Sequence, residues 1–349
     1  MFNYKKQKGT FNFGTKISNV QFRQYDVYAD TTYKRSFINW NPQANYQYRF
    51  TQQSSIGVRY YGYNNQPSID QIQPIRVNND PLNIILGNPA LRPSFTSDFS
   101  VDFNSYKILS EQYIYISVSY SFTSNAITNN TTTDLSTGAN TFKAVNIKNN
   151  TPKNFYIYSS MSRKIKSMDV TVGLDFNANG YSSFNMVNNE LSKTNFGDYY
   201  GNINIAKYKE KKYNFRASVG PAYTAMTSSL GTNDSKGWGI DASASFTLNL
   251  PGKIDIFSDA TYQYKDPTQS FSQNLDRLIW NAGIVKKFFK SENLRLTVKG
   301  NDLMNQNTGF TRGVNGSMIT QSNFTTIKRY FIGSLTWDFN KMGGTPSKK

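Results

Sequence analysis

The chain contains 349 residues, carries a formal net charge of +17, and has neither cysteine nor histidine. Disulfides and thiolate metal sites are therefore excluded, and the chain lacks both the commonest general base and the histidine that a Ser-His-type hydrolase requires. The mean hydropathy is −0.58, and no run of about 18 apolar residues occurs, which excludes helical membrane spans but not membrane-spanning β-strands.

The first half of the chain predicts β-strands in which apolar and polar residues alternate, so that each strand has one apolar and one polar face. From Ala44 to Phe50, for example, every second residue is apolar. The connection Asn64–Ser94 contains five prolines and is expected to hold no regular strand, whereas Asp26–Tyr33 and Ser124–Asn140 are expected as polar loops. The expected strands are Phe11–Tyr25, Ser36–Phe50, Ser54–Tyr63, Thr96–Lys107, Gln112–Thr123 and Thr141–Ile165, the last with an expected weak point at Asn149–Pro152.

The second half contains the clearest alternation, between Trp238 and Leu250, where every even-numbered residue is apolar. A turn at Pro251–Lys253 follows, and the next strand repeats the pattern. Asn179–Lys193 is expected as a loop. The expected strands are Met168–Ala178, Asn195–Tyr208, Lys211–Thr227, Trp238–Leu250, Ile254–Lys265, Asp276–Phe289, Asn293–Met304 and Ser322–Asn340.

These strands predict an all-β fold, an antiparallel transmembrane β-barrel wall of about 14 strands. Most are long enough for the roughly 9–11 residues with which a tilted strand crosses a bilayer. Short turns near Thr51, Ser110, Ser167, Glu210, Gly252 and Ser291 alternate with longer loops near Asp70, Thr131, Val187, Asn233, Ser270 and Gly313. Outer-membrane barrels show this asymmetry between short periplasmic turns and long extracellular loops, and a soluble sandwich has no reason to keep it.

The positive charge favours solvated turns and lumen-facing residues over a nucleic-acid site, because the lysines gather between strands and not along one helix face. The clusters are Lys5-Lys6, Lys164-Ile165-Lys166, Lys207 to Lys212, Lys286-Lys287 and Lys290. No pair of carboxylates, phosphate-binding loop or metal-ligand set identifies an enzyme. We therefore expect no catalytic residue, no cofactor, no metal and no nucleic-acid partner.

Three groups of residues are candidate contacts, although each has a plain structural explanation. Asp70, Asn79 and Asp80 could touch a solute or an ion, but Asn-Asp-Pro also favours turns. Gly87-Asn88-Pro89 could form a binding tip, but a tight turn explains it as well. Carboxylates on polar strand faces could line a cation path or pair across the lumen with Arg and Lys residues, for example Arg216 or Arg59. These carboxylates are Asp175, Asp241, Asp255 and Asp259.

Aromatic residues near strand ends predict the girdles that anchor barrel strands at the bilayer interface, the alternative being the core of a soluble sandwich. They are Tyr60, Tyr61, Tyr63, Tyr262, Tyr264 and Trp337.

Three stretches resemble the outer-membrane β-barrel family related to TonB-dependent receptors of Bacteroidetes-type bacteria. They are YGYNNQPSIDQIQPIRVNNDPLNIILGNPALRP (Tyr61–Pro93), NDLMNQNTGFTR (Asn301–Arg312) and IKRYFIGSLTWDFNKMGG (Ile327–Gly344). The resemblance implies that residues 1–349 form the C-terminal portion of a barrel of about 22 strands. We find neither a plug nor a signal peptide, and Phe2 and Tyr4 are expected to end a strand, with Lys5–Gly9 as a short turn.

The resemblance also implies location in the cell outer membrane, contact with lipid and lipopolysaccharide, and uptake of an extracellular nutrient that the sequence does not identify. The TonB complex would be a partner only through a missing N-terminal plug. Two alternatives stay open: a plug-less passive pore, which would conduct ions by itself, and a soluble secreted β-protein used in adhesion, which would need no detergent.

Overall fold

The computed structural model describes residues 1–27, 30–73, 76–230, 234–269, 272–315 and 318–339. In this part of the chain the fold is all-β, with a main sheet of 19 strands and a separate two-stranded hairpin. Among these described residues, helical structure is confined to α1 (Ile69–Ile72) and a 3-10 turn at Ile108–Ser110. Neither segment approaches the length and apolarity that a membrane-crossing helix needs.

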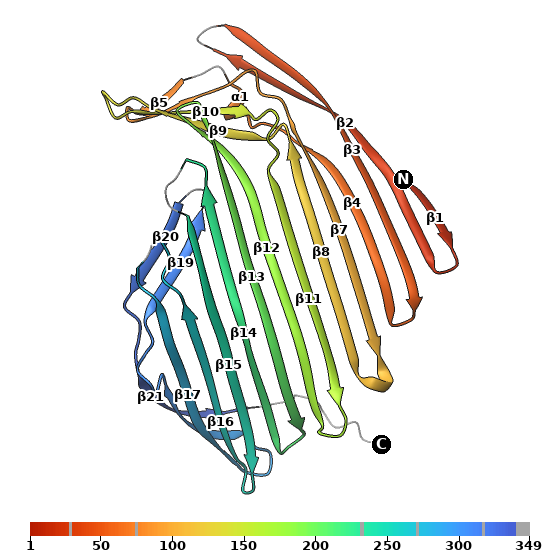
Figure 1. Cartoon of the computed structure of the whole chain (residues 1–349), viewed down its shortest axis with the longest axis vertical. Helices are drawn as coiled ribbons and strands as arrows, with labels where there is room; N and C mark the ends of the chain where they lie inside the picture. The colour runs from red at the N-terminus through yellow and green to blue at the C-terminus, as the bar shows by residue number, and fades with distance from the viewer. Residues whose placement is uncertain (28–29, 74–75, 231–233, 270–271, 316–317, 340–349) are drawn as a thin grey trace, which may run out of the picture.

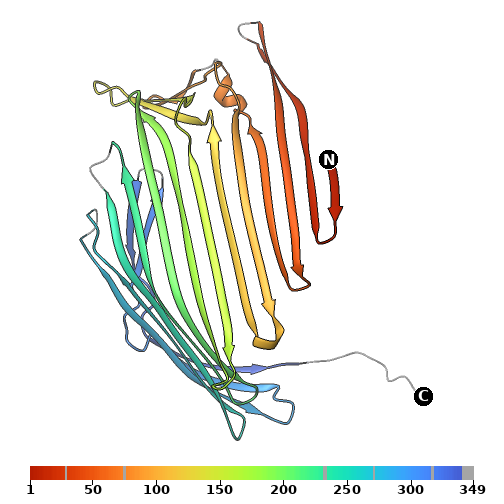
Figure 2. The same cartoon turned by 45° about the vertical axis from the view of Figure 1, so that its right-hand side comes forward.

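Fifteen strands form what we call the wall, a tall curved sheet in which each strand is antiparallel to the next (Figure 1). Figure 2 shows the curvature, with the red and orange strands on one side and the blue-green strands on the other. The wall strands are β1 (Phe2–Lys6), β2 (Gly9–Asp26), β3 (Thr31–Thr51), β4 (Ser54–Asn65), β7 (Ser94–Lys107), β8 (Gln112–Ser124), β11 (Lys153–Ile165), β12 (Val170–Val187), β13 (Glu190–Lys209), β14 (Tyr213–Ser228), β15 (Ser235–Leu250), β16 (Ile254–Lys265), β17 (Leu275–Phe288), β18 (Leu294–Asn301) and β21 (Tyr330–Trp337).

The short turns predicted from the sequence all lie at one end of the wall, whereas a further two-residue turn joins β12 to β13 at the opposite end, where a longer loop near Val187 was expected. The predicted short turns join β1 to β2, β3 to β4, β7 to β8, β11 to β12, β13 to β14, β15 to β16 and β17 to β18, and they gather at the lower end in Figure 1. The expected strand ending at Phe2 and Tyr4 is confirmed as β1, and its turn to β2 is Gln7-Lys8. Outer-membrane barrels place such short turns in the periplasm, so the resemblance predicts that this rim is the periplasmic one.

The wall is an open sheet and not a closed barrel. Among the described residues β1 pairs only with β2, and β21 pairs only with β18, so two edges remain between them. All eight residues of β21 are exposed. The described chain therefore forms a curved barrel-like wall but no closed barrel.

The expected number of about 14 strands is also wrong. The described chain has 21 strands, and the difference comes from short elements with weak alternation. These are β1, the hairpin strands β19 (Gly309–Asn315) and β20 (Met318–Phe324), and four strands at the long-loop end, namely β5 (Arg76–Asp80), β6 (Asn83–Leu86), β9 (Ile127–Thr133) and β10 (Asn140–Asn146).

Three expected boundaries are corrected as well. Asn179–Lys193 is not a loop, because β12 and β13 continue through it to a two-residue turn at Asn188-Asn189. Thr141–Ile165 divides into β10 and β11 at the expected weak point. Ser322–Asn340 divides into the end of β20 and β21, while Asn340 itself lies outside the described residues.

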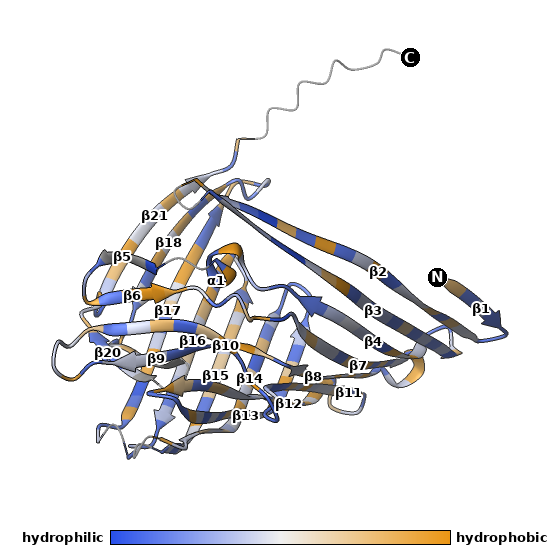
Figure 3. Ribbon diagram, turned by 90° about the horizontal axis from the view of Figure 1, so that it is seen from above, coloured by the Kyte–Doolittle hydropathy of each residue, from blue (hydrophilic) through white to orange (hydrophobic). Residues whose placement is uncertain are grey.

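Four short strands and α1 form a cap at the long-loop end, where Figure 3 shows them lying across the mouth of the curved sheet. Within this cap β5 pairs with β6, β6 runs parallel to β10, and β10 pairs with β9. Two residues of β9 then run parallel to the end of β12, which ties the cap to the wall. The prediction of no regular strand in Asn64–Ser94 is therefore wrong.

The buried apolar cluster of the described chain lies in the cap and not in the wall. It consists of Ile72, Leu91 and Ala144, with Phe22 and Ile127 packed against it. Ser68 begins α1 with a capping box, in which its hydroxyl accepts from the Gln71 amide and the Gln71 side chain accepts from the Ser68 amide. A one-turn helix is too short to be stable alone, so the capping box and the burial of Ile72 hold it in place.

Orange and blue bands alternate along many of the strands in Figure 3, and because successive side chains of a strand point to opposite faces, the wall has two chemically different faces. One row of directly opposed residues crosses eleven strands on the apolar face. It consists of Tyr4, Phe11, Tyr46, Val58, Val101, Val118, Ile157, Ala178, Tyr199, Tyr223 and Trp238. Because cross-strand neighbours share a face, this row defines the face that meets lipid, which we call the outward face.

The neighbouring row, one residue away on each strand, lies on the opposite face and is almost entirely polar. It consists of Asn3, Asn12, Asn45, Arg59, Ser100, Ser119, Tyr156, Asn179, Asp198, Thr224 and Gly237. This face is the one that would line the interior of a barrel, and we call it the lumen face.

Candidate functional site

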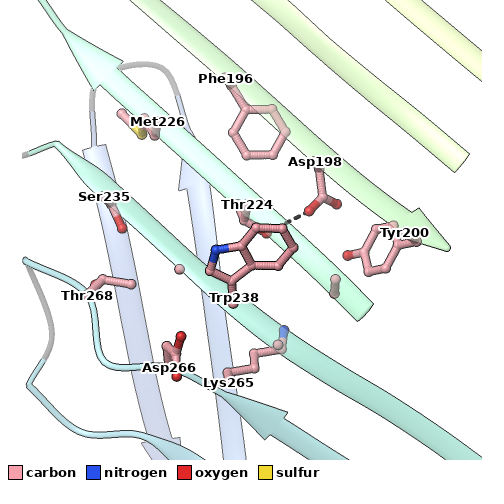
Figure 4. Close-up of a pocket in the computed structure, with 13 residues that line it drawn as sticks. Phe196, Asp198, Tyr200, Thr224, Met226, Ser235, Trp238, Lys265, Asp266 and Thr268 are labelled. Atoms are coloured by element: carbon pink, nitrogen blue, oxygen red, sulfur yellow. Dashed lines mark hydrogen bonds between the residues drawn. The ribbon is translucent and has the colours of Figure 1, made fainter. Parts of the chain in front are cut away.

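A cavity of about 280 Å³ lies on the lumen face of four neighbouring strands, β13 to β16, toward the long-loop end (Figure 4). Cross-strand pairing builds it from three short rows of residues. They are Phe196–Met226–Ser235, Asp198–Thr224–Gly237 and Tyr200–Ala222–Gly239–Lys265. Its volume is at the lower limit of ligand pockets, which span about 300–1,000 Å³, so it fits a single small polar unit.

Small residues form the floor of the cavity. A Cβ atom at Gly237 would lie 3.2 Å from Cγ2 of Thr268, and one at Gly239 would lie 2.8 Å from the carbonyl oxygen of Tyr264. Glycine inside a strand weakens the strand and often marks a place where a ligand or another backbone comes close. The two glycines leave room on the lumen face that any larger residue would fill.

The cavity offers hydrogen-bonding groups of several kinds beside two aromatic rings. The Asp198 carboxylate accepts a 2.6 Å hydrogen bond from the Thr224 hydroxyl and also interacts with the hydroxyl of Tyr200. Lys265 and Asp266 line the opposite side, where Asp266 interacts with Tyr264. This mixture suits a ligand with several hydroxyl or amide groups more than a purely apolar one.

One hydroxyl in the lining has no hydrogen-bond partner among the described residues. Oγ1 of Thr268 is buried and unpaired, and its side chain lines the cavity. An unsatisfied buried polar atom costs about 1–3 kcal/mol, so native proteins rarely keep one without a reason. A hydrogen-bonding ligand in the cavity would provide that partner.

The four predicted lumen carboxylates do lie on the lumen face, but they do not converge on one path. Asp255 forms an ion pair with Lys287, whose Nζ lies 2.8 Å from the Asp255 carboxylate. The other three accept hydrogen bonds from side-chain amides, Asp175 from Asn204, Asp241 from Gln263 and Asp259 from Asn281. Arg59, expected as a partner of this set, instead pairs with Asp102.

Of the three loop candidates, Asp80 has a structural role. Asp80 accepts hydrogen bonds from the side chain of Asn83 (2.8 Å) and the amide of Leu82 (2.9 Å), and these bonds hold the pKa of its carboxyl below the ordinary range. Asp70 is exposed in α1, and the Asn79 side chain lies outside the described residues. Asp80 therefore shapes the turn between β5 and β6, as turn chemistry predicts.

Gly87-Asn88-Pro89 stabilises the cap through hydrogen bonds and close backbone packing. Nδ2 of Asn88 donates to the Ala144 carbonyl oxygen at 2.7 Å, and its backbone amide donates to the Gln71 carbonyl oxygen at 2.6 Å. A Cβ atom at Gly87 would lie only 1.5 Å from the Gln73 carbonyl oxygen. Glycine is required here because two backbone segments approach closely.

The predicted aromatic girdle divides between the two faces. Tyr60 lies on the outward face with its ring 4.7 Å from that of Phe99, and Tyr262, Tyr264 and Trp337 share that face. Strand alternation places Tyr61 and Tyr63 on the lumen face. The outward row has an aromatic ladder that the prediction missed, in which Tyr223 lies between Tyr199 and Trp238 at ring-centroid distances of 6.2 and 4.7 Å.

The cavity itself was not foreseen from the sequence. Its residues come from four strands and a connecting segment, so no local motif joins them. The one available signal was Gly237-Trp238-Gly239, two glycines spaced to share a face within an otherwise alternating strand. Within the described chain, no group of three or more histidine, cysteine, aspartate or glutamate residues could hold a metal ion.

Comparison with known proteins finds one family model, described as "Outer membrane protein beta-barrel family", which matches residues 1–227. No curated protein matches. Among solved structures, OmpT of Vibrio cholerae has a TM-score of 0.35 at 10% identity, with 96% of this chain and 100% of that chain covered. The P. putida toluene transporter TodX has a TM-score of 0.29 at 11% identity, with 97% and 91% covered. Scores this low establish no common architecture.

Proposed function

Because the chain belongs to the outer membrane protein beta-barrel family and therefore lies in the outer membrane, we propose that its strands form the wall of a transporter that takes up a polar nutrient. The observation that carries the proposal is the polar row from Asn3 to Gly237, which crosses eleven strands directly beside the apolar row. A lumen lined in this way can hold water and pass hydrophilic solutes.

The cavity is a candidate contact site for a solute that passes along the lumen face. Asp198, Lys265 and the unpaired Thr268 hydroxyl would exchange hydrogen bonds with a passing solute, while the rings of Phe196 and Tyr200 supply flat apolar surfaces. A small cavity open to the lumen suits transient contact during passage. We propose no catalytic role for the chain.

We further propose that the transporter is of the TonB-dependent-receptor type, with these residues forming the C-terminal portion of its barrel. Support comes from the three stretches that resemble the family related to TonB-dependent receptors, whose barrels have about 22 strands. In such a receptor the plug, and not the wall, contacts the TonB complex. The cap and the other long-loop segments would meet the solute first.

A passive pore is the second candidate, favoured by the same polar lumen face. The soluble adhesin does not fit an outer-membrane chain. Both transport candidates require a water-filled lumen, and they differ in whether uptake needs energy from TonB.

Single-cysteine labelling tests the lumen directly, because the chain contains no cysteine of its own. We expect the Ser119→Cys variant to react with a charged, membrane-impermeant thiosulfonate at least about tenfold faster than Val118→Cys, since a charged reagent enters hydrocarbon only at a cost of several kcal/mol. The two positions are neighbours on β8, so depth and local folding are matched. Equal rates at both positions would refute the face assignment and the transport proposal with it.

Uptake assays then separate the two transport candidates. Cells that express the full-length protein would be given a panel of labelled polar solutes, with and without functional TonB. The receptor proposal expects uptake to stop without TonB. Continued uptake, together with steady KCl conductance in planar bilayers, would favour the passive pore.

A further inference from the structure

Cations occupy outward-facing positions at the periplasmic rim, where the apolar band ends. On β11, Arg163 follows Met161 on the outward face and lies directly opposite Val172. On β13, Lys207 follows Ile205 in the same way and lies opposite Phe215. Other outward cations at this rim are Lys6, Lys107, Lys209 and Lys286.

A groove of about 550 Å³ lies beside Arg163. It is lined by residues 161–166 of β11 and its turn and by residues 172–174 of β12. Its upper part is apolar, with Met161 directly opposite Leu174, and its lower part carries Arg163, Lys164 and Lys166. The groove thus changes from apolar to cationic over one strand end.

The cations of the groove differ in their partners. Lys164 forms two ion pairs, with its Nζ 3.0 Å from Asp169 and 3.8 Å from Glu111. Arg163 is exposed, and neither it nor Lys166 forms an ion pair with any described residue. An outward arginine at this depth would leave its guanidinium between hydrocarbon and water without a counterion.

We propose that this groove binds one anionic phospholipid of the periplasmic leaflet, with the phosphate on Arg163 and Lys166 and an acyl chain along Met161 and Leu174. A guanidinium binds a phosphate through two parallel hydrogen bonds, which suits Arg163 better than a point charge would. The apolar and cationic parts lie in the order in which a lipid presents its chain and its headgroup. The site rests on the outer-membrane location and not on the transport proposal.

The charge around the groove favours an anionic headgroup over a zwitterionic one. Lys207 and Lys209 approach closely enough to affect the Asp169 carboxyl in the adjoining turn, so the rim there is strongly cationic. Each lysine or arginine near an anionic membrane surface strengthens attachment about fivefold. A soluble acidic protein fits less well, because the bilayer would cover the outward face from which Arg163 projects.

Spin-labelled lipids test the site in phosphatidylcholine membranes that contain the full-length protein. We expect the motionally restricted fraction to be larger for labelled phosphatidylglycerol than for labelled phosphatidylcholine. Arg163→Gln should lower this selectivity about fivefold, and Arg163→Lys should retain part of it. Lys212→Gln is the matched control, because it removes one charge from the same rim at a turn residue outside the groove.

Four results would overturn the proposal. They are the absence of any preference for phosphatidylglycerol in the unaltered protein, equal losses in Arg163→Gln and Lys212→Gln, full displacement of the labelled lipid by millimolar inorganic phosphate, and full displacement by soluble polyglutamate. If Arg163→Gln fails to insert, the Arg163→Lys and Lys166→Gln variants provide the same comparison.

Discussion

Replacing Gly87 by alanine should open the cap without disturbing the wall. The added Cβ atom would lie 1.5 Å from the Gln73 carbonyl oxygen and 2.7 Å from its carbonyl carbon, distances that no packed structure tolerates. The backbone after β6 must therefore move away from the end of α1. Arginine, lysine or any other larger residue would meet the same obstacle.

The movement has a definite energetic consequence. It breaks the two Asn88 hydrogen bonds to Gln71 and Ala144 and exposes part of Leu91, which is only 1% exposed. Each hydrogen bond contributes about 1 kcal/mol and a buried leucine about 1.5–3 kcal/mol, so the closed cap loses about 3–5 kcal/mol of stability relative to its open form. At about 1.4 kcal/mol for each factor of ten, the open form becomes at least about 100-fold more populated.

Limited trypsin digestion in membranes measures that population. Lys143 lies in the middle of β10, paired on one side with Asn130 and on the other with Leu86, so cleavage there requires the cap to open. We expect cleavage after Lys143 to accelerate about 100-fold in Gly87→Ala. Gly57→Ala is the control, because a Cβ atom at Gly57 in β4 would meet nothing within 4 Å. Unchanged cleavage in Gly87→Ala, or equal acceleration in Gly57→Ala, would refute the reasoning.

Three further variants test the turn charges and the cavity. A hydrogen bond from Lys164 holds the pKa of the Asp169 carboxyl below its ordinary value near 3.8. The stabilisation that this carboxylate provides is complete above pH 3.8 and is lost as the pH falls through the lower pKa of the folded state. Urea unfolding from pH 7 to pH 3 should therefore show an acid-dependent loss of stability that is smaller in Asp169→Asn. Thr224→Val removes the hydrogen bond to Asp198 and should lower the free energy of unfolding by about 1–3 kcal/mol. Thr268→Val removes an unpaired hydroxyl and should not lower the free energy of unfolding. Equal unfolding midpoints for these two variants would count against the assigned roles.

The long wall strands could be predicted because their two faces meet different surroundings. Between Trp238 and Leu250 one face meets lipid and the other the lumen, so the sequence alternates strictly. Above the membrane this requirement ends, since both faces of a strand meet water. Asn179 to Lys193 contains many small polar residues for that reason and is typical of a loop by composition, although its backbone pairing continues.

The cap and the cavity could not be predicted from local patterns. The cap joins Asn83 to Asn140 and Asn130 to Met186, pairs that lie more than fifty positions apart in the chain. The cavity depends on the register of four strands, and a shift of one residue in any of them would move its side chains to the lipid face. Register is set by the whole wall, which no single stretch encodes.

The parallel pairings of the cap also constrain the order in which the molecule can assemble. Most wall strands join the next strand along the chain, so the wall can grow by successive hairpins with short loops to close. The contact between β9 and β12 needs both strands in place, with the whole of β10 and β11 between them in sequence. We therefore expect the mouth to be covered only after the central wall has formed, which leaves the interior accessible to late-arriving segments during folding.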